Sequence, residues 1–168
     1  MARGKGIVQI LKVMPPAASA ALIDVRTGGS TPAEAVQVWT FDADSSQYMD
    51  FLCKLEGYGG GGLTFTIVYS MSSAAADQAR WEIAIRRIQD DAEDIDVSHS
   101  YVFNGVSDTV PSASGEVSYP TIAFTNGADM DNWVEGEMAI VRIYRDHDHA
   151  DDTATGDAEL WGIFGLET

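Results

Sequence analysis

The chain has 168 residues, of which 45% are hydrophobic and 21% are charged, a globular composition that excludes wholesale disorder. Its 26 acidic and 10 basic residues give a formal net charge of −16, and a field of this sign repels nucleic acid and anionic membranes. No apolar run approaches the ~20 residues of a membrane span. The single cysteine, Cys53, excludes an intrachain disulfide framework and a cysteine-based zinc cluster.

The beginning of the chain differs from the rest in charge. Residues 1–26 hold four basic residues and one acidic residue, a net charge of +3, whereas residues 27–168 hold six basic and 25 acidic residues, a net charge of −19. We therefore expect residues 1–19 to form an extended N-terminal arm and residues 20–168 to form the folded body. The arm residues expected to make contacts with other molecules are Arg3, Lys5, Ile7, Ile10 and Lys12.

The apolar run over residues 7–13 indicates what the arm does. It is too short and too often interrupted by polar residues for a secretion signal, so we expect a protein made in the cytoplasm of its cell with no signal peptide. It is also too apolar to stay in water, which favours addition of a strand to a neighbouring molecule. A frayed terminus is the alternative.

Alternation of apolar and polar residues with a period of two dominates the rest of the chain. Strict alternation argues against parallel sheets, whose strands read as continuous apolar runs. The pattern predicts an all-β, antiparallel, jelly-roll-like β-sandwich of about eight to nine strands. The predicted strands cover residues 36–41, 48–55, 63–71, 80–86, 139–144 and 158–164, and weaker ones cover 21–26, 99–103 and 117–124.

The sequence also predicts the two faces of the strand over residues 158–164 and two short helical segments. Alternation over residues 158–164 places Leu160 and Phe164 on one face and Trp161 and Ile163 on the other. Short helical segments are expected over residues 74–79 and 128–134, the first from its run of alanines.

Three polar or glycine-rich segments predict loops. Residues 57–62 match the spacing of a dinucleotide-binding loop, but they open a strand and not a helix, which favours a turn. The acidic residues 90–96 could supply oxygen ligands for Ca²⁺, and His147 and His149 could bind Zn²⁺ or Ni²⁺. Because neither segment completes a known ligand pattern, we expect solvated loops, no metal and no cofactor.

Catalytic patterns are missing from the sequence. It contains neither a G-x-S-x-G nucleophile turn nor an H-E-x-x-H zinc motif. Cys53 falls in the middle of a predicted strand, which favours a buried and inert thiol. We therefore predict that the protein is not an enzyme.

The four tryptophans raise the question of sugar binding, since indole rings form platforms for sugar rings. Trp81 shares a strand face with Ile83 and Ile85 and is expected in the core, whereas Trp133 falls in a predicted loop and is the candidate for exposure. The alternative for Trp133 is a loop side chain that plugs one end of the sandwich.

The last third of the chain carries a resemblance. Glu135-Gly136-Glu137 precedes the strand over residues 139–144, which ends on Arg145-Asp146, and an acidic turn then leads to Asp157-Ala158-Glu159-Leu160-Trp161-Gly162-Ile163. This pattern resembles the final hairpin of jelly-roll virion structural proteins of tailed bacteriophages. The resemblance implies a capsid decoration, cement or head-fibre protein on the virion surface, and it supplies no catalytic residues.

On this resemblance, the expected partners are the major capsid protein or another virion protein, together with further copies of the chain, a trimer being favoured. Arg142 and Arg145 are scarce positive charges in an acidic body, and we expect them to neutralise the Asp-rich turn or to pair across a subunit boundary. The alternative function is a carbohydrate- or receptor-binding jelly roll of a phage fibre or tail.

Overall fold

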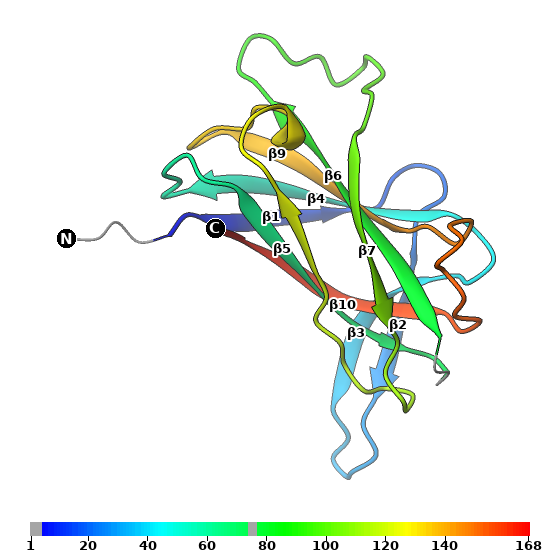
Figure 1. The fold of residues 1–168 in the computed structure, drawn as a ribbon. Coiled ribbons are helices and arrows are strands. Elements are labelled where there is room, and N and C mark those ends of the chain that lie inside the picture. The colour runs from blue at the N-terminus through cyan, green and yellow to red at the C-terminus, as the bar shows by residue number, and fades with distance from the viewer. Residues whose placement is uncertain (1–4, 74–76) are drawn as a thin grey trace.

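The computed structural model describes residues 5–73 and 77–168, which fold into two layers of β-sheet (Figure 1). One layer has the strand order β1-β4-β9-β6-β7 and the other the order β2-β3-β10-β5-β8, and all these neighbours pair antiparallel. The strands are β1 (Ile7–Met14), β2 (Leu22–Thr27), β3 (Ala35–Phe41), β4 (Gln47–Glu56), β5 (Leu63–Met71), β6 (Gln78–Ile88), β7 (Phe103–Thr109), β8 (Thr121–Phe124), β9 (Met138–Arg145) and β10 (Ala158–Glu167). The predicted all-β, jelly-roll-like sandwich is confirmed, with ten strands in place of eight to nine.

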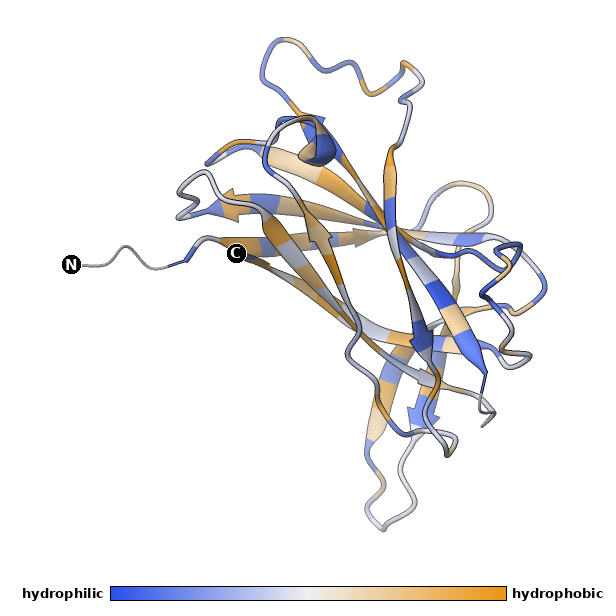
Figure 2. Cartoon of the chain, in the orientation of Figure 1, coloured by the Kyte–Doolittle hydropathy of each residue, from blue (hydrophilic) through white to orange (hydrophobic). Residues whose placement is uncertain are grey.

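The core lies between the two layers, where the inward residues of the alternating strands meet. Figure 2 shows apolar and polar residues alternating along the strands. Trp81 on β6 is fully buried and contacts Phe41 and Tyr69 from the opposite layer, with ring centroids 5.1 and 5.3 Å apart in edge-on geometry. Aromatic pairs of this kind favour close contact between the layers beyond the burial of their area.

The predicted arm is not free. Residues Ile7–Met14 form β1, which pairs with β4 of the same chain along its whole length and with the end of β10. Val8 is 7% exposed in the core. Ile7, Ile10 and Lys12 therefore belong to the sandwich, and since their side chains are exposed, their contacts with other molecules stay a prediction.

Strand β1 joins the two layers, so the boundary expected after residue 19 is wrong for the part of the arm that the structure describes. Lys5 is exposed just before β1, and Arg3 lies outside the described residues. A β-bulge between Ile10 and Lys12 interrupts the alternation of β1.

Two weaker strand predictions need correction. The strand expected over residues 99–103 is a loop up to Phe103, where β7 begins, and β7 then runs on to Thr109. The strand expected over residues 117–124 forms only at its end, as β8. Both lie at the rim of the sandwich, where few neighbours enforce alternation.

The helical predictions have mixed outcomes. A single 3₁₀ turn, η1, covers Ala128–Met130 within the predicted segment 128–134. For the segment 74–79, residues 74–76 lie outside the described part of the chain, and the last two residues begin β6. No helix within residues 5–73 and 77–168 is long and apolar enough to cross a membrane.

A second bulge reverses the faces of β10. The pairing of β10 with β5 shifts by one residue between Leu160 and Gly162, which leaves Trp161 as the extra residue. Past this point Ile163 turns into the core, with 5% exposure, and Phe164 turns outward, with 43% exposure. The strict alternation predicted for this strand is therefore wrong after Trp161.

Candidate functional site: a hollow beside Trp161

A hollow of about 350 Å³ lies where the β2–β3 hairpin meets β10. This volume falls at the lower end of the range of about 300–1,000 Å³ that small-molecule sites occupy. Its lining combines apolar side chains and glycine backbone with one guanidinium and one carboxylate. The residues that line it are Arg26, Thr27, Gly28, Glu34, Val36, Gly115 and Trp161.

Trp161 is the extra residue of the β10 bulge and borders this hollow. Bulges re-aim side chains, and they recur next to binding sites. The indole Nε1–H donates to Ser70 Oγ at 2.9 Å, and Ser70 is fully buried on β5. This bond fixes the half-buried ring by its polar edge and leaves ring surface available to the hollow.

Arg26 is held by a chain of polar contacts that continues to the tryptophan. Its Nη1 donates to the carboxylate of Glu159, and its Nη2 donates to Ser114 Oγ at 2.8 Å. Glu159 is only 8% exposed and also accepts a hydrogen bond from Ser70 Oγ at 2.7 Å. The guanidinium and the indole are thus preorganised through shared partners, which lowers the ordering cost of binding.

Glu34 is the one carboxylate among the lining residues, and no ion pair joins it to a cation of residues 5–73 or 77–168. Arg26 is neutralised by Glu159. Glu34 lies at the hairpin turn, and its carboxylate covers Gly28, where an added Cβ atom would lie 2.5 Å from Oε2. An anionic ligand would be repelled by this arrangement, whereas a neutral ligand with hydroxyl groups can donate to Glu34 and accept from Arg26.

Gly115 is required on the opposite side of Arg26. It has a φ of +82°, the left-handed region that side chains rarely adopt. An added Cβ atom would lie 2.6 Å from Nη2 of Arg26. The glycine therefore lets the 110–120 loop close against the guanidinium.

The predicted site residues lie elsewhere, and two of them are structural. Arg145 is fully buried and pairs with Asp152 of the acidic turn, the first of the two alternatives expected for it. Trp133 is also fully buried, and its Nε1–H donates to the carbonyl of Glu137 at 3.0 Å. The expected exposure of Trp133 is wrong, and its ring instead plugs an end of the sandwich.

Arg142 does not reach the acidic turn. It forms two hydrogen bonds of 2.7 Å with Asp50 on β4, and its guanidinium lies 5.6 Å from the ring centre of Tyr48 and 4.4 Å from that of Tyr101. Burial raises the pKa of Tyr101 above its ordinary value. Because the rings and the carboxylate surround Arg142, this cluster anchors the loop over residues 89–102 on the sheet.

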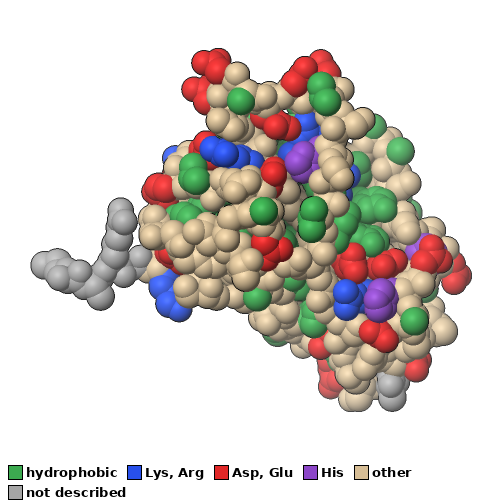
Figure 3. All heavy atoms as spheres, turned by 45° about the horizontal axis from the view of Figure 1, so that its top comes forward, with side chains coloured by type: hydrophobic (Ala, Val, Ile, Leu, Met, Phe, Trp, Pro, Cys, Tyr) green, Lys and Arg blue, Asp and Glu red, His purple; other side chains and the backbone are tan. Residues whose placement is uncertain are grey.

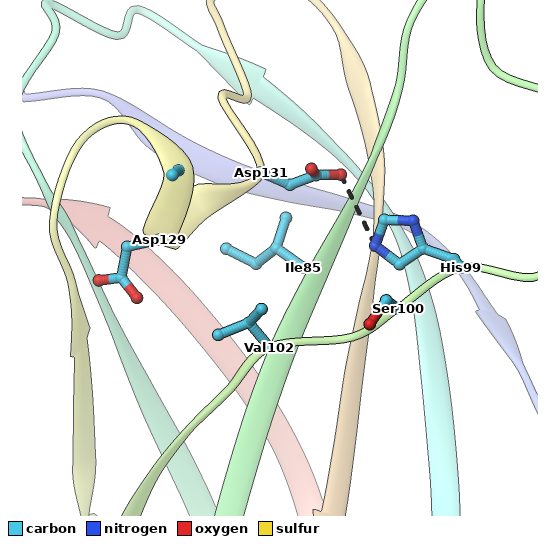
Figure 4. Close-up of a pocket in the computed structure, with 7 residues that line it drawn as sticks. Ile85, His99, Ser100, Val102, Asp129 and Asp131 are labelled. Carbon is cyan, nitrogen blue, oxygen red and sulfur yellow. Dashed lines mark ion pairs between the residues drawn. The ribbon is translucent and has the colours of Figure 1, made fainter.

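A small pocket lies beside the same loop (Figure 4). It is lined by Ile85, Val102 and a pair formed by His99 and Asp131, whose Nε2 and Oδ2 atoms are 3.8 Å apart. Its volume of about 20 Å³ has room for about one water molecule. The pocket is therefore too small for an organic ligand.

The two segments considered for metals form no metal site in the part of the chain that the structure describes. Over residues 5–73 and 77–168, no group of three or more His, Cys, Asp or Glu side chains could hold an ion. His147 contacts Ser46 Oγ through Nδ1 at 3.2 Å, and His149 accepts from the backbone N–H of Asp151. Figure 3 shows the acidic side chains spread over the surface of this view in separate groups.

The residues of the hollow were missed because they come from distant parts of the sequence. One signal was available for Arg26, which is the single basic residue between Lys12 and Lys54. Another was the i, i+2 spacing of Glu159 and Trp161, which places a carboxylate and an indole on one face of a strand.

Comparison with known proteins adds little to this description. No known protein family and no curated protein matches the chain. One solved structure to which it is similar is TmCBM61 in complex with β-1,4-galactotriose, with 10% sequence identity over 94% of this chain and 88% of that one. The TM-score is 0.40, a value too low to support an inference about ligands, so function is argued from the residues of this chain.

Proposed function

We propose that the protein is a non-catalytic carbohydrate-binding β-sandwich that holds a neutral sugar in the hollow beside Trp161. One observation carries this proposal: an indole fixed by its edge to Ser70 borders a hollow of about 350 Å³ that has Arg26 at its rim. A flat apolar ring beside oriented polar groups matches a sugar, which has an apolar C–H face and a polar circumference.

The contacts available to a sugar follow from the groups that the protein itself leaves unused. Stacking on Trp161 removes apolar surface of both partners from water. A guanidinium has five N–H donors, and those of Arg26 that face Glu159, Ser114 and the Met71 carbonyl are occupied. The remaining donors and the Glu34 carboxylate can form charge-assisted hydrogen bonds with hydroxyl groups.

Charge selects among sugars. The net charge of −16 and the carboxylate of Glu34 at the hollow both oppose uronic acids, sialic acids and sulfated glycans. A neutral hexose or pentose unit experiences no such repulsion. We therefore propose neutral glycans as the ligand class.

The virion hypothesis rested on the resemblance of residues 130–164 and on a free arm. Since β1 belongs to its own sandwich, exchange of the arm between molecules is no longer an argument for it. Association with a capsid, a fibre or a tail stays a prediction, which co-sedimentation with particles would test.

The proposal is tested by titration calorimetry with neutral sugars. Glucose, galactose, mannose and xylose and their β-1,4-linked oligosaccharides form the panel, and we expect at least one to bind. Trp161→Ala removes the stacking surface and is expected to weaken binding about 30-fold, equivalent to about 2 kcal/mol.

The matched control is Tyr119→Ala, which removes an aromatic side chain that is 61% exposed and does not line the hollow. Its affinity for the same sugar should equal that of the unaltered protein. Failure of every neutral sugar to bind, or an equal loss in both variants, would overturn the proposal.

A further inference from the structure

Within residues 5–73 and 77–168, strand β2 pairs with β3 alone and has an uncovered edge. It is hydrogen-bonded to β3 on one side, and the β2–β3 hairpin extends away from the body of the sandwich (Figure 1). Leu22, Ile23 and Val25 are 66%, 59% and 55% exposed, and Figure 2 shows the apolar residues of this hairpin. Soluble proteins seldom leave an apolar edge strand without a partner or a blocking device.

The hydrogen-bonding groups that point outward from β2 follow from its pairing. The backbone N–H of Gly28 donates to the carbonyl of Glu34 at 2.8 Å, so even-numbered residues of β2 exchange their bonds with β3. Alternate residues of an antiparallel strand point their N–H and C=O groups to opposite sides. The outward groups therefore belong to Ile23, Val25 and Thr27.

We propose that β2 pairs antiparallel with β2 of a second copy of this chain, with Val25 opposite Val25 of the partner subunit. The outward N–H and C=O groups of the two strands meet only when odd-numbered residues lie opposite odd-numbered residues. A two-fold axis near the middle of β2 then passes through residue 24, 25 or 26. Centres on Asp24 or Arg26 would bring like charges together. The centre on Val25 instead places Asp24 opposite Arg26 of the partner subunit, on both sides of the axis.

Pairing in this register satisfies the edge. Val25 exchanges two hydrogen bonds with its equivalent, and Ile23 and Thr27 exchange two with each other across each half, giving about six in total. In the single chain, Oδ1 of Asp24 accepts the outward N–H of Val25 at 2.7 Å. The partner's backbone carbonyl replaces this acceptor in the dimer, which frees the carboxylate to face the opposite arginine.

The dimer would have a functional consequence that rests on the proposed sugar site. A two-fold axis through Val25 is perpendicular to the sheet, so equivalent faces of the two copies lie on the same side. Arg26 lines the hollow, and both hollows would open toward that side. Two sites on one side allow simultaneous attachment to a surface that displays many sugars, which strengthens retention without any new contact.

The dimer is tested by sedimentation velocity of the full chain over a range of concentrations. We expect a dimer for the unaltered protein and a monomer for Val25→Pro, since proline lacks the outward N–H, while no hydrogen bond to β3 is lost. The matched control Val25→Thr keeps the N–H and a β-branched side chain and should remain dimeric. Asp24→Lys, which sets like charges opposite each other, should shift the dimer toward monomer.

A monomeric unaltered protein at every concentration, or a Val25→Pro variant that remains dimeric, overturns the inference. Binding separates this result from the sugar proposal. Val25→Pro should keep its affinity for a free oligosaccharide but lose at least tenfold in retention on a surface coated with it. A dimer that binds no neutral sugar overturns the proposed function alone, and a monomer that binds one overturns the dimer alone.

Discussion

Arg26 on β2 and Arg145 on β9 each form an ion pair with a carboxylate, but the two pairs differ in their exposure to solvent. The Arg145 side chain is 0% exposed and that of its partner Asp152 is 2% exposed, whereas the Arg26 side chain is 24% exposed and that of Glu159 is 11% exposed. Arg145 donates to Asp152 through Nε at 2.8 Å and Nη2 at 2.6 Å, and also to the carbonyls of Ala154 and Gly156.

The difference separates an enclosed ion pair from one at the edge of a hollow. The chain between β9 and β10 folds around Arg145, and its carbonyls leave no side of the guanidinium for another molecule. Arg26 has protein partners on one side and the hollow on the other. Arg145 therefore serves the fold, and under the proposed function Arg26 serves sugar recognition.

The largest effect is expected at Arg145. Arg145→Ala leaves Asp152 buried without its partner, and breaking a buried pair in this way costs about 3–5 kcal/mol. Asp152 also accepts the backbone N–H of Arg80 at 2.8 Å, so any movement of the unpaired carboxylate toward water would weaken the anchor of β6 as well. Denaturation by urea, followed by far-UV circular dichroism, measures the change, and a loss below about 1 kcal/mol would contradict the structural role.

Arg26→Ala should lower stability less than Arg145→Ala does, and it should also weaken binding. The free energy of unfolding should fall by about 1–3 kcal/mol, since Glu159 keeps its bond to Ser70 and part of its contact with water. Affinity for the sugar identified by titration should fall at least tenfold, because a charge-assisted donor is lost. Unchanged affinity in a folded Arg26→Ala protein would end the distinction between the two arginines.

The sequence predicted the parts of the molecule where each residue's partners follow the regular pleat. The strands over residues 63–71 and 139–144 were found because their inward residues meet a core at every second position. The bulge at Trp161 was not found, since an extra residue leaves no mark in composition. Charge predicted an arm over residues 1–19, whereas β1 pairs with β4 and β10, which are remote in the chain and whose pairing pattern alone does not show.

The hollow was less predictable than the strands. It combines the end of β2, the hairpin turn at Glu34, the 110–120 loop and β10, which lie more than 130 residues apart at the extremes. The sequence directed attention to Arg142, Arg145 and Trp133. Arg145 and Trp133 are fully buried, whereas the Arg142 side chain, 24% exposed like that of Arg26, is held by Asp50 and the rings of Tyr48 and Tyr101. Residue type indicated scarce charges, and only the structure shows what surrounds each of them.

A smaller effect on stability is expected from Cys53, whose thiol reports whether water is excluded from the core beside β1. Burial raises the pKa of the Cys53 thiol from 9.0 to about 12. A raised pKa in the folded state means that this contribution to stability is complete below pH 9 and is lost as the pH rises from about 9 to about 12. The loss is about 1.4 kcal/mol per pH unit within that window.

Two measurements check the behaviour of this thiol. An aromatic disulfide reagent at pH 8 should leave Cys53 unmodified until the protein is unfolded. Between pH 9 and pH 10, before most tyrosines ionise, the free energy of unfolding should fall more steeply for the unaltered protein than for Cys53→Ala. Rapid modification of the folded protein at pH 8 would show that water reaches this part of the core.

The smallest effect compares two glycines near the hollow. Gly115→Ala places a side chain at a φ of +82° and against the guanidinium of Arg26, so stability should fall by about 1 kcal/mol and sugar affinity several-fold. Gly29→Ala is the matched control, since an added Cβ atom at Gly29 meets no described atom within 4 Å and Gly29 does not line the hollow. Urea denaturation and titration with the same sugar should separate the two, because Gly115 holds Arg26 in place whereas a methyl group at Gly29 enters open space. Equal effects on affinity would show that the position of Arg26 does not control recognition.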